Sequence, residues 1–243
     1  MFFHRRSTQA EYFDLPGRSD AETLAAFRDL DYLNSVFVFA KPFEEVLPGW
    51  LGHERCAQLD VLDLGAGTGA LGKKLTTWAD QRGWRWRFTN LDTNLLALKL
   101  GGERRAVVGS ALALPFRDAN FDLVVASQMT HHLTDEQIVM HLREAWRVTR
   151  DALFICDLHR NAGFYAALCL LLPFMRIGQS LRDDALLSVK RAFHLGEWRV
   201  LANVANVSGA KIWLYYGTRI VLQARRRGAE PTNLAGLAKE SGK

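Results

Sequence analysis

VLDLGAGTGALGKK, the stretch from Val61 to Lys74, is an apolar run that breaks into three alternating glycines and then resumes with basic residues. A glycine inside a strand or helix lowers stability by roughly 0.5–1 kcal/mol relative to alanine. The glycines at 65, 67 and 69 therefore indicate a turn whose main chain takes positive φ angles or touches a ligand. In an open parallel sheet, the first strand-to-helix turn borders the ligand site, where the helix offers free N–H groups. We therefore predict a ligand pressed against residues 65–69.

Strands and helices alternate around this turn. We predict strands at 59–64, 84–91, 105–108, 121–127 and 153–157, and helices at 70–81, 94–100 and 134–148. Two more helices, at 161–176 and 195–204, precede a hairpin formed by 211–216 and 219–224. Helical periodicity over 20–46, interrupted by Pro42 and Pro48, predicts one long helix and a looser second turn. The fold class is α/β: a Rossmann-like, mostly parallel seven-stranded sheet with helices on both faces, a C-terminal antiparallel hairpin and an N-terminal helical cap.

Length and composition indicate one sizeable domain with short additions. The chain has 243 residues, of which 49% are hydrophobic and 23% charged, as is common for globular proteins. We divide it into an N-terminal helical extension (1–50), a core domain (51–227) and a flexible tail (228–243). The net charge of +5 includes Arg225, Arg226 and Arg227 near the tail. Such a basic end is usually only solvated, so the charge is weak support for a nucleic-acid or membrane partner.

Several features favour a cytoplasmic protein. The three cysteines, at positions 56, 156 and 169, lack metal-ligand spacing and are expected to be reduced core thiols. The start MFFHRRSTQAEYF has no apolar run long enough for a signal peptide. The most hydrophobic run, AGFYAALCLLLPFM from Ala162 to Met175, is too short to span a bilayer of ~30 Å and is expected to form a buried or cleft-lining helix. No transmembrane segment is expected, peripheral contact with a membrane stays open, and the oligomeric state is undetermined.

The glycines alone admit two ligands. Gly67, Gly69 and Gly72 satisfy the G-x-G-x-x-G pattern of dinucleotide-binding folds, and Asp92 stands where such folds have a ribose-binding acid. Asp63 argues against a dinucleotide, because a carboxylate lies inside the strand where an apolar side chain would be expected. A carboxylate at this position can face the cleft and orient a cationic ligand.

Four segments together make the assignment more specific. LDLGAGTG resembles the first motif of the class I S-adenosylmethionine-dependent methyltransferases, and Leu91-Asp92 ends the second strand as the ribose-binding acid of that superfamily does. VVGSALALPF (107–116) is similar to its adenine-side segment, and FDLVVASQMTHHLTD (121–135) to its fourth strand and following loop. With REAWRVTR, these segments resemble the small-molecule branch similar to ubiquinone/menaquinone-type methyltransferases. The likeness covers residues 59 to about 158.

The resemblance implies S-adenosyl-L-methionine as the cofactor and a set of residues that bind it. Ser110 departs from the superfamily pattern, which often has an acid to receive the adenine amino group; a hydroxyl can accept the same hydrogen bond. Gln128 is expected to meet the cofactor through its backbone. The implied cofactor-binding residues are Asp63, Gly65, Ala66, Gly67, Gly69, Asp92, Ser110, Ala111 and Gln128.

Candidate catalytic residues follow the fourth and fifth strands. The methyl group of such a cofactor is already activated, so a base is needed only if the acceptor must lose a proton. His131 and His132 are candidates, with helix capping or packing as the alternative role. His159 is a third candidate, which Asp157 could orient unless that carboxylate only binds loop backbone. Tyr165 and His194 are further candidates for the pocket wall. No histidine pair has helical i,i+4 spacing and no three-carboxylate cluster occurs, so no metal is predicted.

The apolar N-terminal helix and the run at 162–175 favour a small apolar or aromatic acceptor, quinone-like or polyketide-like, although the same residues could simply complete the core. A nucleic-acid methyltransferase is a rival, but SQMTHHL lacks the Pro-Pro-aromatic element of the amino-methylating enzymes. A nicotinamide-dependent oxidoreductase is disfavoured by Asp63. A non-catalytic protein that binds S-adenosylmethionine is the remaining alternative.

Overall fold

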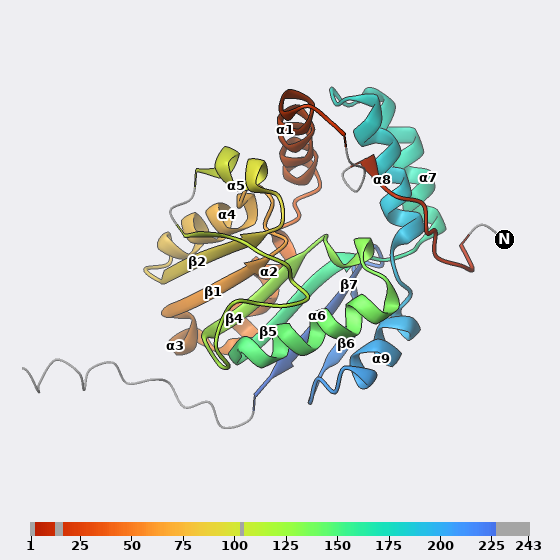
Figure 1. The fold of residues 1–243 in the computed structure, drawn as a ribbon. Coiled ribbons are helices and arrows are strands. Elements are labelled where there is room, and N and C mark those ends of the chain that lie inside the picture. Colours follow the sequence, from red (N-terminus) through yellow and green to blue (C-terminus); the bar gives the residue numbers. More distant parts are fainter. Residues whose placement is uncertain (1–2, 13–16, 103–104, 227–243) are drawn as a thin grey trace, which may run out of the picture.

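A seven-stranded sheet organises the computed structural model, which describes residues 3–12, 17–102 and 105–226 (Figure 1). The strand order is β3-β2-β1-β4-β5-β7-β6, parallel except for β7, which runs antiparallel to both of its neighbours. The predicted fold class is therefore confirmed. The strands are β1 (Gln58–Leu64), β2 (Arg85–Asp92), β3 (Ala106–Val108), β4 (Phe121–Ser127), β5 (Thr149–Leu158), β6 (Lys211–Tyr215) and β7 (Arg219–Arg225).

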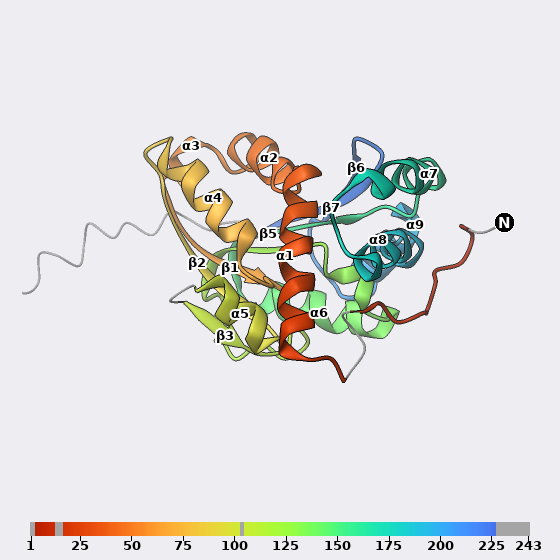
Figure 2. The ribbon, with the colours of Figure 1, turned by 90° about the horizontal axis from the view of Figure 1, so that it is seen from above.

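Alternate side chains of the strands supply two separate cores. Leu62 and Leu64 of β1 join a cluster that includes residues of α6 (Asp135–Val148) and α9 (Leu195–Val204). Val61 points to the opposite face, where α2 (Lys41–Leu51) and α4 (Ala70–Asp80) pack. Seen from above, the two sets of helices lie on either side of the sheet (Figure 2). Because both faces are covered, β1 and β4 are buried over most of their length, as parallel strands usually are.

The order of strands reverses between β1 and β4, which are parallel neighbours although two strands lie between them in sequence. In such sheets the carboxyl ends of the two strands diverge and leave room for a ligand. The turn after β1 and the turn after β4 therefore border the same space. The short α5 (Leu95–Gly101) follows β2 and leads to β3.

The N-terminal region differs from the predicted long helix with a looser turn. Two regular helices form, α1 (Asp20–Val36) and α2, followed by the short α3 (His53–Cys56). Ser19 and Glu22 make a reciprocal capping box that begins α1. Pro42 lies in the first turn of α2, where the missing N–H costs nothing, and Pro48 lies inside it. The predicted boundary at residue 50 falls within α2, whose Phe43 and Leu47 are fully buried.

Three helices form a cap over the carboxyl ends of the strands: α1, α7 (Ala162–Leu171) and α8 (Gln179–Arg191) (Figure 1). They share a small apolar core of Leu33, Leu168, Leu172, Ile177, Leu181 and Val189. We did not predict α8 from the sequence. Asp184, Ser188 and Arg191 are buried on it beside its leucines, so no clear apolar period is visible.

The run at 162–175 was predicted to be a buried or cleft-lining helix, and the second alternative is confirmed because Phe164 and Leu168 line the cavity described below. It folds as α7 and the 3₁₀ turn η3 (Leu172–Phe174), but Leu168 and Leu172 are its only buried residues. Cys169 is exposed, which corrects its prediction as a core thiol, while Cys56 and Cys156 are buried as expected. No helix among the described residues is long and apolar enough to cross a membrane.

Residues 3–12 lie along the cap and join it to the loop after β4. Arg6 donates from Nε to the carbonyl of Arg191 (2.8 Å) and from Nη2 to that of Leu133 (2.8 Å). Its guanidinium also stacks 3.5 Å from the centroid of the Phe193 ring. The Ser7 amide donates to the carbonyl of Lys190 (3.0 Å). Residues 3–12 thus hold part of the cap, whereas the predicted tail and Arg227 lie outside the described residues.

Candidate functional site

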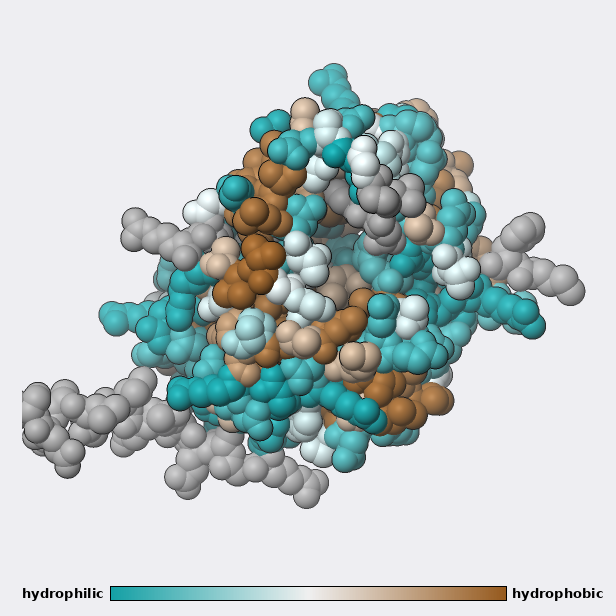
Figure 3. Space-filling view, in the orientation of Figure 1, coloured by the Kyte–Doolittle hydropathy of each residue, from teal (hydrophilic) through white to brown (hydrophobic). Residues whose placement is uncertain are grey.

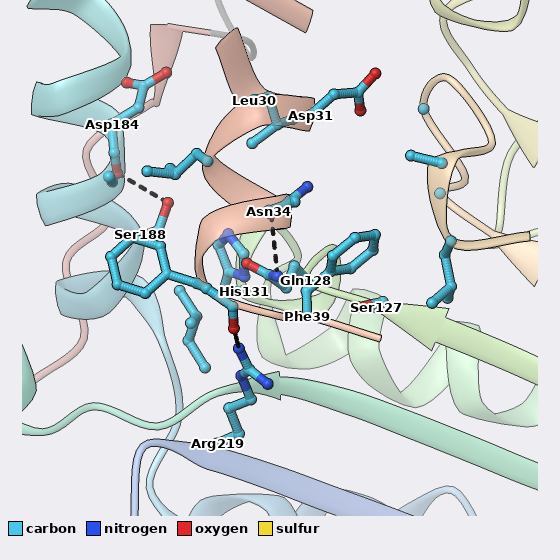
Figure 4. Close-up of a pocket in the computed structure, with 18 of the residues that line it drawn as sticks. Leu30, Asp31, Asn34, Phe39, Ser127, Gln128, His131, Asp184, Ser188 and Arg219 are labelled. Carbon is cyan, nitrogen blue, oxygen red and sulfur yellow. Dashed lines mark hydrogen bonds between the residues drawn. The ribbon is translucent and has the colours of Figure 1, made fainter. Parts of the chain in front are cut away.

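A cavity of about 390 Å³ lies between the cap and the ends of β1 and β4. Its position is visible as a hollow between α1 and α8 (Figure 3), and Figure 4 shows side chains from α1, α8, the β4 loop and β7 facing it. Of the predicted site residues, seven line the cavity: Asp63, Gly65, Ala66, Gly67, Gln128, His131 and His132. The remaining five do not line it: Gly69, Asp92, Ser110, Ala111 and His159.

The turn after β1 has the backbone that its glycines suggested. Gly65, Gly67 and Gly69 have φ angles of 67°, 55° and 73°. A Cβ atom on Gly65 would stand 2.8 Å from Cβ of Met129, so this position excludes any side chain. A Cβ on Gly101, in the last turn of α5, would lie 2.1 Å from the carbonyl oxygen of Thr68. The loop is therefore held closely from two sides while its inner surface faces the cavity.

Asp63 is the most unusual group on the cavity wall. Its side chain is buried, and neither carboxylate oxygen has a hydrogen-bond partner among the described residues. Burial, together with the nearby charge of Asp92, raises the pKa of Asp63 to about 8. A buried charge without a partner is costly to the fold. Such a carboxylate is expected where a bound ligand supplies the missing positive charge or hydrogen-bond donors.

Asp92, at the end of β2, braces the glycine turn. Its Oδ2 accepts a hydrogen bond from the Gly67 amide (2.7 Å), and its Oδ1 accepts one from the Asn94 amide (2.8 Å). Burial raises the pKa of Asp92, against the effect of these hydrogen bonds. Each carboxylate oxygen still has a lone pair for a further donor.

Ser110 and Ala111 stand in the loop after β3. Ser110 is exposed, and its hydroxyl accepts a hydrogen bond from the Leu112 amide (3.2 Å), whereas Ala111 is buried.

Gln128 follows β4 in a strained backbone conformation. Its φ is 52°, in the left-handed region that non-glycine residues seldom adopt. The Gln128 amide donates to the carbonyl of Cys156 (3.1 Å), and its side chain donates from Nε2 to Oδ1 of Asn34 (3.2 Å; Figure 4). Strain of this kind persists where surrounding contacts enforce it and is common at ligand sites. Through its two hydrogen bonds, to Cys156 of β5 and to Asn34 of α1, Gln128 links the sheet to the cap.

A histidine held by a buried carboxylate forms the far side of the site. His131 Nδ1 lies 2.7 Å from Oδ1 of Asp157, at the end of the neighbouring strand β5. Oδ2 of Asp157 accepts hydrogen bonds from the Thr130 amide (2.7 Å), the Thr130 hydroxyl and the His131 amide (3.1 Å). Burial alone would raise the pKa of Asp157, but the charge of His131 and these hydrogen bonds outweigh it and lower the pKa to about 2. Asp157 is therefore ionised, and it fixes the tautomer that leaves Nε2 of His131 free to accept a proton.

The predicted pairing of Asp157 with His159 is wrong. Parallel neighbours β4 and β5 end side by side, so the carboxylate reaches across to His131 rather than along its own strand. His159 instead places Nδ1 2.9 Å from the carbonyl of Gly217 and Nε2 3.5 Å from Nδ1 of His194. Neither His159, His194 nor Tyr165 lines the cavity.

Glu11 is a site residue that the sequence did not indicate. Its buried carboxylate places Oε1 3.8 Å from Nε2 of His131 and Oε2 3.6 Å from Nε2 of His132. Burial raises the pKa of Glu11 to about 7, although His132, Arg191 and a hydrogen bond with Ser188 act in the opposite direction. No motif surrounds Glu11, and only the path of residues 3–12 over the cap brings it to the histidines.

The same three side chains, Glu11, His131 and His132, could hold a divalent cation. Arg191 already places Nε 3.6 Å from Oε1 of Glu11, so positive charge is present beside the carboxylate without a metal. Arg191 also donates to the carbonyl of His132 (2.9 Å), which fixes the turn that carries both histidines. The absence of a metal stays a prediction.

The cap contributes the rest of the wall, and most of it is apolar. The polar side chains that the cap helices add to the wall are Asp31, Asn34, Asp184 and Ser188. Asp31 accepts from the Thr68 hydroxyl (2.9 and 2.8 Å), and Arg219 of the neighbouring β7 donates to the carbonyl of Phe37 (2.5 Å; Figure 4). The sequence signalled an apolar addition but not these residues. The apolar side chains are Phe27, Leu30, Leu33, Phe37, Val38, Phe39, Leu71, Leu158, Phe164, Leu168 and Leu181.

Residues 62–155 match a family model described as "Methyltransferase domain". The curated demethylmenaquinone methyltransferase of Roseiflexus castenholzii is 37% identical over 91 residues, which is 37% of this chain and 37% of that protein. A second such enzyme, from Roseiflexus sp. strain RS-1, is 35% identical over 95 residues. The match thus spans little more than a third of the length of these relatives. The residues matched by the family model contain the β1 turn, Asp92 and the histidine loop.

Solved structures share the fold over more of the chain. The plantazolicin methyltransferase BpumL, in complex with S-adenosylhomocysteine, superimposes with a TM-score of 0.60 at 10% identity, covering 86% of this chain and 89% of that one. Human N-acetylserotonin methyltransferase, in complex with S-adenosylmethionine, gives a TM-score of 0.59 at 15% identity, covering 86% of this chain and 57% of that one. Together with the domain match, they confirm the predicted resemblance to class I S-adenosylmethionine-dependent methyltransferases.

Proposed function

We propose that the protein is an S-adenosylmethionine-dependent methyltransferase whose acceptor is a small, apolar or aromatic molecule of quinone-like or polyketide-like chemistry. The observation that carries this proposal is the pairing of two groups in one cavity. Asp63 offers a buried carboxylate without a hydrogen-bond partner among the described residues, and His131 offers a nitrogen oriented by Asp157. The first group suits a cationic cofactor, and the second suits an acceptor that must lose a proton.

The residues present fit this cofactor. The carboxylate of Asp63 can receive its positively charged part, and the glycine turn can approach it closely because no side chain intervenes. Asp92 keeps lone pairs for ribose hydroxyls, Gly69 is proposed to act as part of the glycine turn, and Ser110 and Ala111 are proposed on the adenine side. When bound, S-adenosylmethionine supplies a methyl group attached to a positively charged sulfur, which is already activated for transfer.

The chain itself then contributes orientation and proton transfer. Well-oriented reactants gain ~7–11 kcal/mol relative to a bimolecular encounter, so the cavity's main task is to align the acceptor. His131 is placed to take a proton from an acceptor hydroxyl, because Asp157 holds its Nδ1. A positioned base of this kind contributes ~10²–10⁴-fold. His132 flanks the same space and is the second candidate, whereas the position of His159 gives it no support.

The acceptor class rests on the apolar cap wall and on the chemistry of the partial relatives. The two relatives that match about 37% of this chain are named demethylmenaquinone methyltransferases, and the wall opposite the glycine turn is largely aliphatic and aromatic. An apolar pocket with few polar groups favours an acceptor with an apolar body and one reactive hydroxyl or activated carbon.

Calorimetric titration with S-adenosylhomocysteine tests the cofactor, with NADH as the comparison. We expect a binding signal with the former only; the reverse would overturn the proposal. A panel of phenols, quinones and carboxylic acids then tests transfer with radiolabelled cofactor. Cofactor binding without transfer to any member would instead favour a non-catalytic binding protein.

A further inference from the structure

The outer side of α7 and η3 is apolar along its whole length. From Ala162 to Met175 the sequence contains no charged side chain. Leu170, Leu171 and Phe174 are 72%, 52% and 88% exposed. We call this surface the α7–η3 face; its exposed residues are Ala162, Gly163, Ala166, Ala167, Cys169, Leu170, Leu171, Pro173 and Phe174.

This surface is unusual because the inner side of the same helix is apolar too. Phe164 and Leu168 line the cavity. A helix on the surface of a soluble domain normally carries polar residues on its outer face. A contiguous exposed apolar patch marks a site for another molecule or for a membrane. With only 10 residues, α7 is ~15 Å long and cannot span a bilayer of ~30 Å, so contact with lipid would be in the plane of the interface.

Basic groups stand at both ends of the face. Arg176, two residues after the end of η3, is exposed, and Arg182 of α8 donates from Nη2 to the carbonyl of Met175 (2.8 Å). At the other end, Lys190 holds its Nζ 4.9 Å from the centroid of the Tyr165 ring. Two acids stand near these groups: Asp183 accepts a hydrogen bond from Gln179 (2.9 Å), and Asp29 accepts one from the Gly178 amide (2.8 Å). An apolar strip between basic ends, on a chain of net charge +5, complements an anionic lipid surface.

We propose that the α7–η3 face docks the protein onto an anionic lipid bilayer, with Leu170, Leu171 and Phe174 inserted at the level of the head groups. The docking stands on the surface alone. Its consequence rests on the proposed function: since α7 separates the bilayer from the cavity and is apolar on both sides, an apolar acceptor could reach the site from lipid without crossing water.

Vesicle sedimentation tests the proposal. The wild type is compared on vesicles of phosphatidylcholine and on an equimolar mixture with phosphatidylglycerol. The test variant is Leu170→Asp with Phe174→Asp. The matched control is Val200→Asp with Val204→Asp on α9, where the side chains are also exposed (61% and 54%) and the charge change is identical. We expect binding to anionic vesicles that weakens with added salt, a loss of at least ~tenfold in the test variant and less than ~threefold in the control.

The other outcomes are decisive as well. Absence of wild-type binding, or equal losses in both variants, would overturn the proposal. So would a concentration-dependent dimer that only the test variant breaks, in the absence of vesicle binding, because the face would then join two copies. Circular dichroism and S-adenosylhomocysteine titration of each variant check that fold and cofactor site are intact. A wild type that binds vesicles but no S-adenosylhomocysteine would refute the proposed function and leave the docking in place.

Discussion

The two walls of the cavity are built in opposite ways. The motif wall, made by the turns after β1 and β4, comes from short continuous segments and contains positive φ angles at Gly65, Gly67 and Gln128. It also leaves the carboxylate of Asp63 and the hydroxyl of Ser127 without hydrogen-bond partners among the described residues. The cap wall comes from Glu11, α1, α7 and α8, is largely apolar, and is fixed by the guanidinium groups of Arg6 and Arg191.

This difference separates two tasks. Backbone strain and unpaired polar groups lower the stability of the fold. They are therefore expected where they serve the binding of one particular ligand. An apolar wall imposes little orientation and admits molecules by size and shape. We therefore expect changes in the motif wall to affect cofactor affinity, and changes in the cap wall to affect acceptor use. His131 stands in the turn after β4, at the edge of the motif wall where Glu11 of the cap wall approaches it.

The largest effect is expected at His131. His131→Ala should lower kcat by ~10²–10⁴-fold, because a positioned base is lost, while S-adenosylhomocysteine affinity changes less than ~threefold. His159→Ala is the control and should leave kcat within ~threefold. Steady-state kinetics with the best acceptor of the panel, together with calorimetry, measure both. Equal losses in kcat and affinity at His131 would make it a structural residue of the motif wall.

The second largest effect is expected for Asp63→Asn, on cofactor affinity. We expect S-adenosylhomocysteine affinity at high pH to fall ~100-fold, because a charge-assisted hydrogen bond is removed from a buried position. Above pH 8, where Asp63 is ionised, the unfolding free energy of the protein without cofactor should rise, since a buried unpaired charge is removed. Calorimetry and urea unfolding measure the two quantities. A variant that loses stability would show that Asp63 serves the fold instead of the ligand.

The pH dependence of the wild type tests the same carboxylate. Its folded-state pKa of about 8 lies above the ordinary 3.8. Between these values the folded protein keeps a proton that the unfolded chain has lost, so this group's contribution to stability falls as pH rises from 4 to 8. Affinity for a cationic cofactor should rise up to ~tenfold per pH unit towards pH 8, with proton release on binding. Asp63→Asn should abolish this slope; a slope unchanged in the variant would point to another group.

Glu11→Gln should have a moderate effect confined to the cap wall. The pKa of Glu11 is raised by burial to about 7, so its charge next to His131 and His132 changes near neutral pH. We expect a ~3–10-fold change in kcat/KM and the loss of an inflection near pH 7 in its pH profile. Cofactor affinity should not move. A shift in cofactor affinity equal to that in kcat/KM would contradict the division between the walls.

The smallest effect is expected at Ser110. Its side chain is exposed and its hydroxyl is already bonded to the Leu112 amide, so Ser110→Ala should weaken S-adenosylhomocysteine binding less than ~threefold. Ser110→Asp, which restores the acid common in the superfamily, is the informative partner variant. A large loss with alanine would show that the hydroxyl holds the adenine amino group directly.

Local signals predicted the motif wall well. The turn after β1 and the ends of the strands are indicated by sequence patterns only a few residues long. Apolar runs and turn residues likewise predicted β1, β4 and the hairpin of β6 and β7. The bond from Asp157 to His131 was within reach of the same reasoning, because the ends of neighbouring parallel strands meet. The error came from preferring the nearer histidine in sequence, His159.

The cap wall was predicted poorly for a physical reason. α8 buries Asp184, Ser188 and Arg191, and these polar residues are satisfied by contacts with segments far away in sequence, such as residues 9–12. Glu11 meets the histidines only because the N-terminal segment crosses the cap. Neither contact has a local pattern, so only a structure could reveal them.

The path of the first residues has a consequence for how the chain is made. Arg6 binds the carbonyl of Arg191, 185 positions later, and Ser7 binds Lys190. At a synthesis rate of roughly 5–20 residues per second, the N-terminal segment leaves the ribosome roughly 10–40 seconds before its docking partners exist. Arg6 and Ser7 therefore cannot dock before residues 190 and 191 have been made, and Glu11 meets Arg191 only after that point in synthesis.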